Sequence, residues 1–290
     1  MKALVFGAGL GERMRPLTDD RPKALVEVGG RVLIDHMLDR LAKAGVETAV
    51  VNVHAFADRL IAHLAARAAG PRIVISDERA HDLPLETGGG IKFARRHLGE
   101  EPILVANIDS VWLEDAEPPA QAIRELCAGF DPAAMSVRLM LARMERTTGF
   151  DGPGDFFMES DGRLIGRRAA AADTAPMNYM GVHVVDPAEI FAHPETAFGL
   201  FPGGGGIWGG WAAAGRLHGS LMEGDWMHVG DPAARDVADQ PHHVANRVLV
   251  VAQRTQPLAS ELGPHDLVVV ETHPPAGQET AGRRLADVVQ

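Results

Sequence analysis

The sequence predicts an α/β fold whose sheet is largely parallel and is covered by helices on both faces. Three observations support this prediction. Strand-like and helix-like stretches alternate through the first half of the 290-residue chain, which is typical of parallel sheets with helical crossovers. The strand-like stretches are short and rich in aliphatic residues, as at residues 48–52 and 103–107. The helix-like stretches repeat their apolar residues at the spacing of one helical face, as at residues 32–44.

The remaining elements follow in chain order. Strands are expected at residues 2–6, 48–52, 72–76, 103–107 and 134–141, and helices at residues 32–44, 55–68, 91–98 and 119–128. The second half is more irregular, with a hairpin that turns at Asp161 and Gly162. Strands are expected there at residues 180–185, 217–221 and 226–229, and a glycine-dense loop at 201–211 runs into a helix. A last short helix begins near Asp231, with Pro232 in its first turn.

Composition narrows the class of protein. The net charge of −11 repels a polyanion, so no nucleic-acid partner is expected. The single cysteine, Cys127, excludes an internal disulfide and a cysteine-based zinc site. No stretch approaches the roughly 20 apolar residues of a membrane helix, and the first residues lack a secretory pattern. We therefore expect a cytoplasmic location without a membrane partner. Residues 1–240 are expected to form the functional domain, and residues 241–290 an appendage with no recognisable chemistry.

The opening loop, GAGLGERMRPLTDDRPK at residues 7–23, combines glycines with basic side chains. It fails the dinucleotide pattern G-x-G-x-x-G, because Glu12 or Met14 occupies the place of the third glycine, and it lacks the P-loop pattern. Backbone amides at residues 8–11 could instead cradle a triphosphate. Arg13 and Lys23 could neutralise its β- and γ-oxygens. The loop therefore predicts a small-anion site in an otherwise acidic protein.

Residues 7–41 resemble the opening of the sugar-1-phosphate nucleotidyltransferases. The signature of that family is G-x-G-[ST]-R-[ML]-x-P-L-T, followed by P-K-x-[LM]. It is matched by Gly9, Gly11, Arg13, Met14, Pro16, Leu17, Thr18, Pro22, Lys23 and Leu25. Two positions depart from it, since Gly7 replaces a usual alanine and Glu12 a usual serine or threonine. The resemblance implies a Rossmann-like, three-layer nucleotidyltransferase fold with a mixed, mostly parallel sheet.

Further matches extend the resemblance over the first 240 residues. The LETGGG segment at residues 85–90 resembles the loop that holds the nucleotide base, although Thr87 there is also a candidate helix cap. VANIDS at residues 105–110 resembles the strand end whose aspartate binds the metal, which implies Asp109 as a Mg²⁺ ligand. The implied nucleotide site consists of Ala8, Gly9, Leu10, Gly11, Glu12, Arg13, Lys23, Glu86, Thr87, Gly88 and Gly89.

The segment WMHVGDP at residues 226–232 resembles the motif that supplies a second metal carboxylate, but His228 stands at the aspartate position. Magnesium prefers oxygen ligands, so His228 is a weak metal candidate. It could instead contact a phosphate, orient a metal-bound water, or be purely structural. Asp225 is expected on the opposite face of the strand and cannot replace it.

The compact length and the LETGGG segment most resemble the N-acetylmuramate-1-phosphate uridylyltransferases of cell-wall recycling. GPGDF at residues 152–156 and NYMGVHV at residues 178–184 resemble sugar-contacting segments. The implied sugar site consists of Asn107, Asp155, Tyr179 and Gly181. Mannose-1-phosphate guanylyltransferases share most of these matches, so that activity remains an alternative.

The resemblance implies that UMP is transferred from UTP to a sugar-1-phosphate and that pyrophosphate leaves. The nucleophile is already an anion, so the catalytic residues are cationic or metal-binding: Arg13, Lys23 and Asp109 with Mg²⁺. A non-catalytic nucleotide-binding protein and a glycosyltransferase of related fold remain open. A monomer or small homo-oligomer is expected.

Overall fold

The computed structural model describes residues 1–115, 120–200 and 206–240, so the expected appendage at 241–290 lies outside the described residues. The strands are β1 (Lys2–Phe6), β2 (Glu27–Val28), β3 (Arg31–Val32), β4 (Thr48–Val53), β5 (Arg72–Asp77), β6 (Ile103–Asn107), β7 (Ser110–Glu114), β8 (Val137–Arg143), β9 (Thr147–Thr148), β10 (Phe156–Met158), β11 (Leu164–Gly166), β12 (Met177–Val185), β13 (Leu217–Leu221) and β14 (Gly224–His228). The helices are α1 (Leu33–Lys43), α2 (Ala57–Ala65), α3 (Glu86–Phe93), α4 (Arg95–Leu98), α5 (Gln121–Ala128), α6 (Ala188–Ala192), α7 (Ile207–Ala213) and α8 (Pro232–Ala238). Short 3-10 turns form η1 (Glu12–Met14), η2 (Lys23–Leu25) and η3 (Met144–Arg146).

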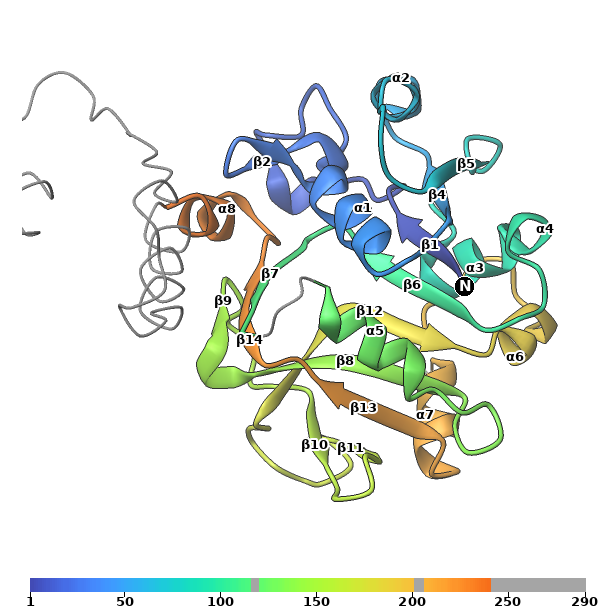
Figure 1. The fold of residues 1–290 in the computed structure, drawn as a ribbon, viewed down its shortest axis with the longest axis vertical. Coiled ribbons are helices and arrows are strands. Elements are labelled where there is room, and N and C mark those ends of the chain that lie inside the picture. Colours follow the sequence, from blue (N-terminus) through green and yellow to red (C-terminus); the bar gives the residue numbers. More distant parts are fainter. Residues whose placement is uncertain (116–119, 201–205, 241–290) are drawn as a thin grey trace, which may run out of the picture. The chain divides into compact units, whose positions relative to one another are not determined.

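A nine-stranded mixed sheet forms the centre of the fold (Figure 1). Its main path runs β11-β10-β12-β6-β1-β4-β5, and β8 joins β12 on one side and β13 on the other. The contiguous group β6-β1-β4-β5 is parallel throughout. Antiparallel pairing begins where β12 lies against β6 and β8. The α/β fold with a mixed, mostly parallel central sheet is therefore confirmed.

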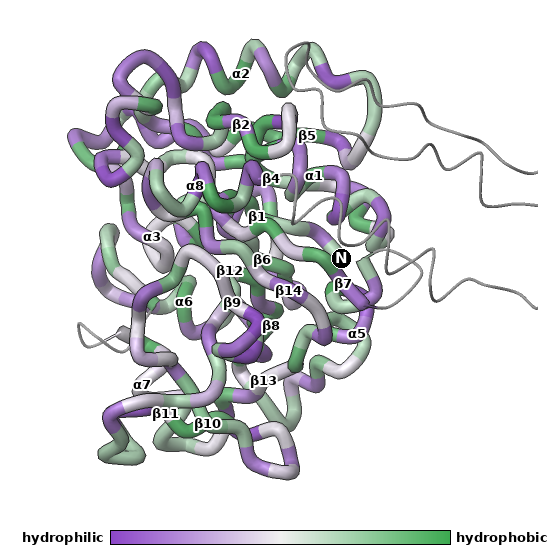
Figure 2. Tube along the Cα trace, turned by 90° about the vertical axis from the view of Figure 1, so that its left-hand side faces the viewer, coloured by the Kyte–Doolittle hydropathy of each residue, from purple (hydrophilic) through white to green (hydrophobic). Residues whose placement is uncertain are grey.

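Helices cover both faces of this sheet, which gives the three layers expected. Along β1, Ala3 and Val5 pack into the cluster that contains α1, α2 and α5. Leu4, which points to the other face, packs with α3, α4, α6 and α7. The surface helices are amphipathic, as the alternation of hydrophobic and hydrophilic residues along α2 shows in Figure 2. The sheet is thus buried on both sides, as its aliphatic strands require.

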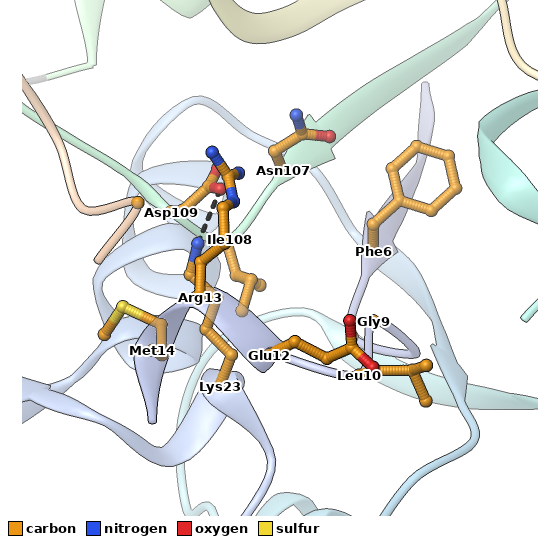
Figure 3. Close-up of a pocket in the computed structure, with 13 residues that line it drawn as sticks. Phe6, Gly9, Leu10, Glu12, Arg13, Met14, Lys23, Asn107, Ile108 and Asp109 are labelled. Carbon is orange, nitrogen blue, oxygen red and sulfur yellow. Dashed lines mark hydrogen bonds and ion pairs between the residues drawn. The ribbon is translucent and has the colours of Figure 1, made fainter. Parts of the chain in front are cut away.

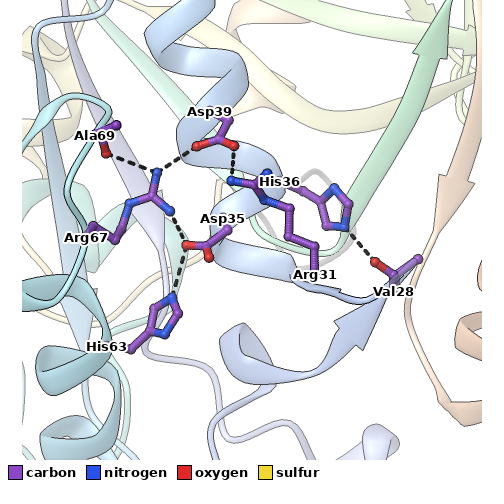
Figure 4. A network of polar contacts seen from close by, with 8 residues as sticks. All are labelled: Val28, Arg31, Asp35, His36, Asp39, His63, Arg67 and Ala69. Atoms are coloured by element: carbon purple, nitrogen blue, oxygen red, sulfur yellow. Dashed lines mark hydrogen bonds and ion pairs between the residues drawn. The ribbon is translucent and has the colours of Figure 1, made fainter. Parts of the chain in front are cut away.

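A polar network fixes α1 against the end of α2 (Figure 4). Arg67 bridges two carboxylates of α1, those of Asp35 and Asp39. Its Nη2 lies 2.7 Å from Asp39 Oδ1, and its Nη1 forms an ion pair with Asp35. His63 Nε2 lies 3.0 Å from Asp35 Oδ1, and Arg31 pairs with Asp39. Burial alone would raise the pKa of Asp35, but His63 and Arg67 hold that pKa below its ordinary value. The network therefore stabilises the contact between the two helices.

A separate three-stranded sheet, in the order β7-β14-β9, lies next to the end of β6. Strand β7 begins at Ser110, directly after the turn that carries Asp109, and it pairs antiparallel with β14 so that His228 lies opposite Ser110. The sequence analysis did not predict β7, because only two residues, Ile108 and Asp109, separate it from β6. This small sheet brings residues 109 and 228 together.

Two helix expectations differ from the structure. The helix expected at residues 91–98 begins five residues earlier, at Glu86, and divides into α3 and α4. The glycines of LETGGG are thus helical although glycine disfavours helices. The helix expected at 55–68 is shorter, at Ala57–Ala65. Strands β1, β6 and β13 have the bounds expected, and Pro232 lies in the first turn of α8, which Asp231 caps. Among the described residues, no helix is both long and apolar enough to cross a bilayer.

Candidate active site

Two adjoining pockets open where the parallel strands β1, β4, β5 and β6 end. The first, which we call the Lys23 lobe, has a volume of about 500 Å³ and includes Arg13, Lys23 and Asp109 in its wall. The second, which we call the Glu78 lobe, has a volume of about 540 Å³ and includes Asn52, Glu78 and Thr87. Both walls contain Phe6, Gly9, Leu10 and Asn107. The site lies where ligands bind in open α/β sheets, beyond the carboxyl ends of the strands.

The opening loop forms one side of the Lys23 lobe. Gly11 has a left-handed backbone with φ of 68°, which glycine adopts without strain, and it leads into η1. Thr18 Oγ1 donates to Gly11 O at 2.8 Å and fixes the turn. In Figure 3 the Arg13 side chain reaches toward Asp109, whereas the Glu12 carboxylate lies on the other side, near Leu10. The loop therefore presents one cation and one carboxylate to different parts of the lobe.

Lys23 and Asp109 form the central ion pair of the lobe, with Nζ 2.8 Å from Oδ2 (Figure 3). The two residues are 86 positions apart in sequence, and both side chains are largely buried. Burial alone would raise the pKa of Asp109, but the Lys23 ammonium, with a smaller contribution from His228, holds it below its ordinary value. Asp109 is therefore ionised at neutral pH and available to a cation.

His228 ends β14 beside Asp109. The Val229 amide donates to Asp109 O at 2.8 Å, which ties the two segments together. Burial, with Lys23 and Arg13 nearby, lowers the pKa of His228 despite the opposing effect of Asp109. Such a histidine is neutral at pH 7, and its role as a metal ligand stays a prediction.

Asp225 does not reach this part of the site. Its Oδ1 accepts from Arg146 Nε at 2.9 Å, and its side chain is half exposed. It therefore cannot stand in for the carboxylate that His228 replaces. Within the described part of the chain, no group of three or more histidine, cysteine, aspartate or glutamate residues could hold a metal ion by itself.

A buried pair, Asn52 and Glu78, holds the Glu78 lobe together. Asn52 Oδ1 accepts from the amides of Gly7 and Ala8 at 2.8 and 3.2 Å. Asn52 Nδ2 donates to Glu78 Oε1 at 2.8 Å, and Glu78 Oε2 accepts from Leu85 N at 3.2 Å. Glu78 is fully buried. The pair thus connects the opening loop after β1 to the segment that begins α3.

The start of α3 forms another wall of the Glu78 lobe through Glu86 and Thr87. The amide N–H groups of Gly88 and Gly89 are not free to bind a ligand in the lobe. Both donate to Phe198 O, at 2.8 and 3.2 Å. Base contact by these two glycines stays a prediction. The alternative that Thr87 caps the helix is wrong: no side chain caps α3, and Thr87 Oγ1 instead accepts from Leu200 N at 3.0 Å.

The residues expected around the sugar lie behind Asn107. Gly181 has φ of 76°, and a Cβ there would lie 2.9 Å from Asn107 Nδ2. Asp155 Oδ2 accepts from the Tyr179 amide at 3.0 Å, and burial raises the pKa of Asp155. Asn107 lines both lobes, whereas the other three residues line neither. The four therefore form one connected group, and their contact with a sugar stays a prediction.

Within this group, Tyr179 also belongs to an aromatic cluster with His183 and Trp208. Its hydroxyl lies 2.6 Å from His183 Nδ1, and both rings meet Trp208 edge-on. Burial raises the pKa of Tyr179 and lowers the pKa of His183 to about 3. Both side chains are therefore uncharged over the physiological range.

Comparison with known proteins decides the family. The model of the MobA-like NTP transferase domain matches residues 3–141. The chain is 53% identical to N-acetylmuramate alpha-1-phosphate uridylyltransferase from Caulobacter vibrioides over 240 residues, which cover 82% of this chain and 95% of that protein. It is a sugar-1-phosphate nucleotidyltransferase.

More distant nucleotidyltransferases agree with this assignment. Mannose-1-phosphate guanyltransferase from Aspergillus fumigatus is 28% identical over 249 residues, covering 80% of this chain and 61% of that protein. The solved structure of a putative glucose-1-phosphate thymidylyltransferase from Bacillus anthracis has a TM-score of 0.65 at 16% identity, covering 84% of this chain and 95% of that one. The structural match carries the fold alone.

Several wall residues of this nucleotidyltransferase were not among the sequence candidates. They are Phe6, Gly7, Met14, Asn52, Glu78, Leu83, Pro84, Ile108, Ala197 and Gly230. Asn52 and Glu78 had a readable signal, because they lie at the carboxyl ends of β4 and β5. Ala197 had none, since it reaches the pocket from a segment more than 100 residues beyond the LETGGG motif.

Proposed function

We propose that this enzyme transfers UMP from UTP to N-acetylmuramate-1-phosphate and releases pyrophosphate, in the recycling of cell-wall sugars. The observation that carries the proposal is the 53% identity, over 95% of its length, to a relative named for that reaction. The two-lobed pocket supports it, because one lobe offers Arg13 and Lys23 to phosphates and the other has a mixed polar and apolar wall that suits a base.

In this proposal the Lys23 lobe holds the phosphates. Amides of the opening loop and the Arg13 guanidinium neutralise the pyrophosphate that leaves. Lys23 binds the α-phosphate or the incoming sugar phosphate and thereby reduces the repulsion between two anions. No proton transfer is required, because the attacking phosphate oxygen is already ionised.

Magnesium is part of the proposal, and the residues present fit it. Asp109 supplies one buried, ionised carboxylate at the wall of the Lys23 lobe. One or two carboxylates plus substrate phosphates are the usual protein environment of Mg²⁺. When bound, the ion would stabilise the negative charge that develops on the phosphates. The Lys23 ammonium, which now pairs with Asp109, would be released to a phosphate.

The Glu78 lobe would take the nucleobase and ribose. Ala8 and Leu10 from the opening loop and Glu86 and Thr87 from the start of α3 line it on two sides. The sugar would lie beyond Asn107, the residue common to both lobes. Asp155, Tyr179 and Gly181 would support it from below.

A matrix of UTP, GTP, CTP and dTTP against several sugar-1-phosphates tests the proposal by pyrophosphate release. We expect the highest kcat/KM for UTP with N-acetylmuramate-1-phosphate. A maximum for GTP with mannose-1-phosphate would support the guanylyltransferase alternative, which the Aspergillus relative favours. Nucleotide binding without pyrophosphate release for any pair would support a binding protein. Omission of Mg²⁺ is expected to abolish turnover. The cytoplasmic location and the monomeric or small oligomeric state stay predictions, for cell fractionation and size-exclusion chromatography to test.

A further inference from the structure

Residues 193–200, which we call the strap, follow α6 and lie across the start of α3. Three sets of hydrogen bonds hold the strap there. Phe198 O accepts from Gly88 N and Gly89 N, Leu200 N donates to Thr87 Oγ1, and Lys92 Nζ donates to Glu195 O at 3.1 Å. The strap therefore supplies the acceptors that the first amides of α3 lack within the helix.

The glycines of LETGGG fit the strap closely. A Cβ on Gly88 would lie 2.2 Å from Phe198 Cε2, and one on Gly89 would lie 2.3 Å from Thr196 O. Both distances are too short for any larger residue. The His193 ring stacks on Phe198 with 3.9 Å between centroids. These contacts fix the backbone on both sides of Ala197.

Ala197 itself lies in the wall of the Glu78 lobe, facing the same space as Leu10, Leu83 and Glu86. We propose that the strap forms the outer wall of the base site and that Ala197 is a binding residue that limits the space available to the nucleobase. This inference rests on the proposed function, because it takes the Glu78 lobe as the place of the base. It assigns part of the nucleotide site to the second half of the chain.

The physical reason is the fixed backbone. Phe198 and Leu200 anchor the strap one and three residues beyond Ala197, so a larger side chain at 197 cannot move away with its backbone. Ala197 is exposed to the pocket and solvent rather than packed in the core, so a larger side chain there need not disturb folding. The added volume therefore enters the Glu78 lobe and leaves the Lys23 lobe unchanged.

The test compares Ala197→Phe and the milder Ala197→Leu with the wild-type enzyme. The matched control is Ala192→Phe, an exposed alanine at the end of α6 that lines neither lobe. The dissociation constants of UTP and of inorganic tripolyphosphate are measured by calorimetry, and pyrophosphate release is measured in parallel. Tripolyphosphate lacks the base and reports on the Lys23 lobe alone.

We expect Ala197→Phe to weaken UTP binding at least about tenfold, and Ala197→Leu to weaken it less. Tripolyphosphate binding should change less than about twofold, and the Ala192→Phe enzyme should match wild type in both. If Ala197→Phe binds UTP as wild type does, or loses equal affinity for UTP and tripolyphosphate, the inference is overturned. The proposed function still stands in that case if the wild-type enzyme turns over. A wild-type enzyme that binds UTP in the expected pattern without any turnover would overturn the proposed function alone. Absence of wild-type UTP binding would overturn both.

Discussion

Glu78→Gln should weaken both the fold and the nucleotide site. The fully buried carboxylate accepts from Asn52 Nδ2 through one oxygen and from Leu85 N through the other. Glutamine keeps one oxygen and replaces the other with an NH₂ group, so one buried N–H loses its acceptor. Leaving a buried donor unpaired costs about 1–3 kcal/mol. A whole domain is stable by only about 5–15 kcal/mol, so this loss is easily measured.

Urea denaturation of the two proteins measures the loss. We expect the midpoint of Glu78→Gln to fall while the slope m stays the same, because the surface exposed on unfolding does not change. The KM for UTP should rise, because Leu85 precedes the α3 residues that line the Glu78 lobe. The exposed Glu101→Gln is the matched control and should leave both quantities unchanged. Equal midpoints for Glu78→Gln and wild type would refute the structural role given to this carboxylate.

Three other outcomes follow from the geometry. Arg13→Ala should lower kcat/KM by at least ~10²-fold, the loss typical of one positioned electrostatic stabiliser, whereas the outward Arg15→Ala should retain near-wild-type kinetics. Gly88→Ala should cost about 1–3 kcal/mol in thermal or urea unfolding, because its Cβ would overlap the aromatic ring of the strap; Gly9→Ala meets no atom within 4 Å and should unfold like wild type. The lowered pKa of Asp35 stabilises the fold above its unfolded value of 3.8, and that stability is lost as pH falls through the folded pKa. Asp35→Asn should therefore lose less stability than wild type between pH 5 and pH 3, and an equal loss would contradict the ion-pair account.

The sequence predicted the central sheet because each parallel strand is a short aliphatic stretch that helix-like stretches separate from the next strand. The same logic placed Asn107 at a strand end, where ligands bind. It did not place Lys23 against Asp109, since no spacing rule connects residues 86 positions apart; the family resemblance suggested both for the same site.

The start of α3 shows why other features were missed. Three consecutive glycines argue against a helix by propensity, so the predicted helix began at Ile91. The structure begins it at Glu86, because Phe198 O accepts the amides of Gly88 and Gly89 and the strap packs where side chains would be. Tertiary contact overrides propensity here. A window of neighbouring residues carries no information about a segment 110 residues away.

The strap also limits how far the chain can be shortened from its C-terminal side without losing part of the base site. The matched domain model stops at residue 141, which includes the opening loop, Asp109 and the LETGGG segment. A fragment cut there would lack Phe198, so two amides at the start of α3 would have no protein acceptor. It would also lack β12, which pairs with both β6 and β8. During synthesis the base site would thus be incomplete until residue 200 has left the ribosome. Residues 3–141 therefore contain only a portion of the site, and transplanting them into another scaffold would require the strap to come with them.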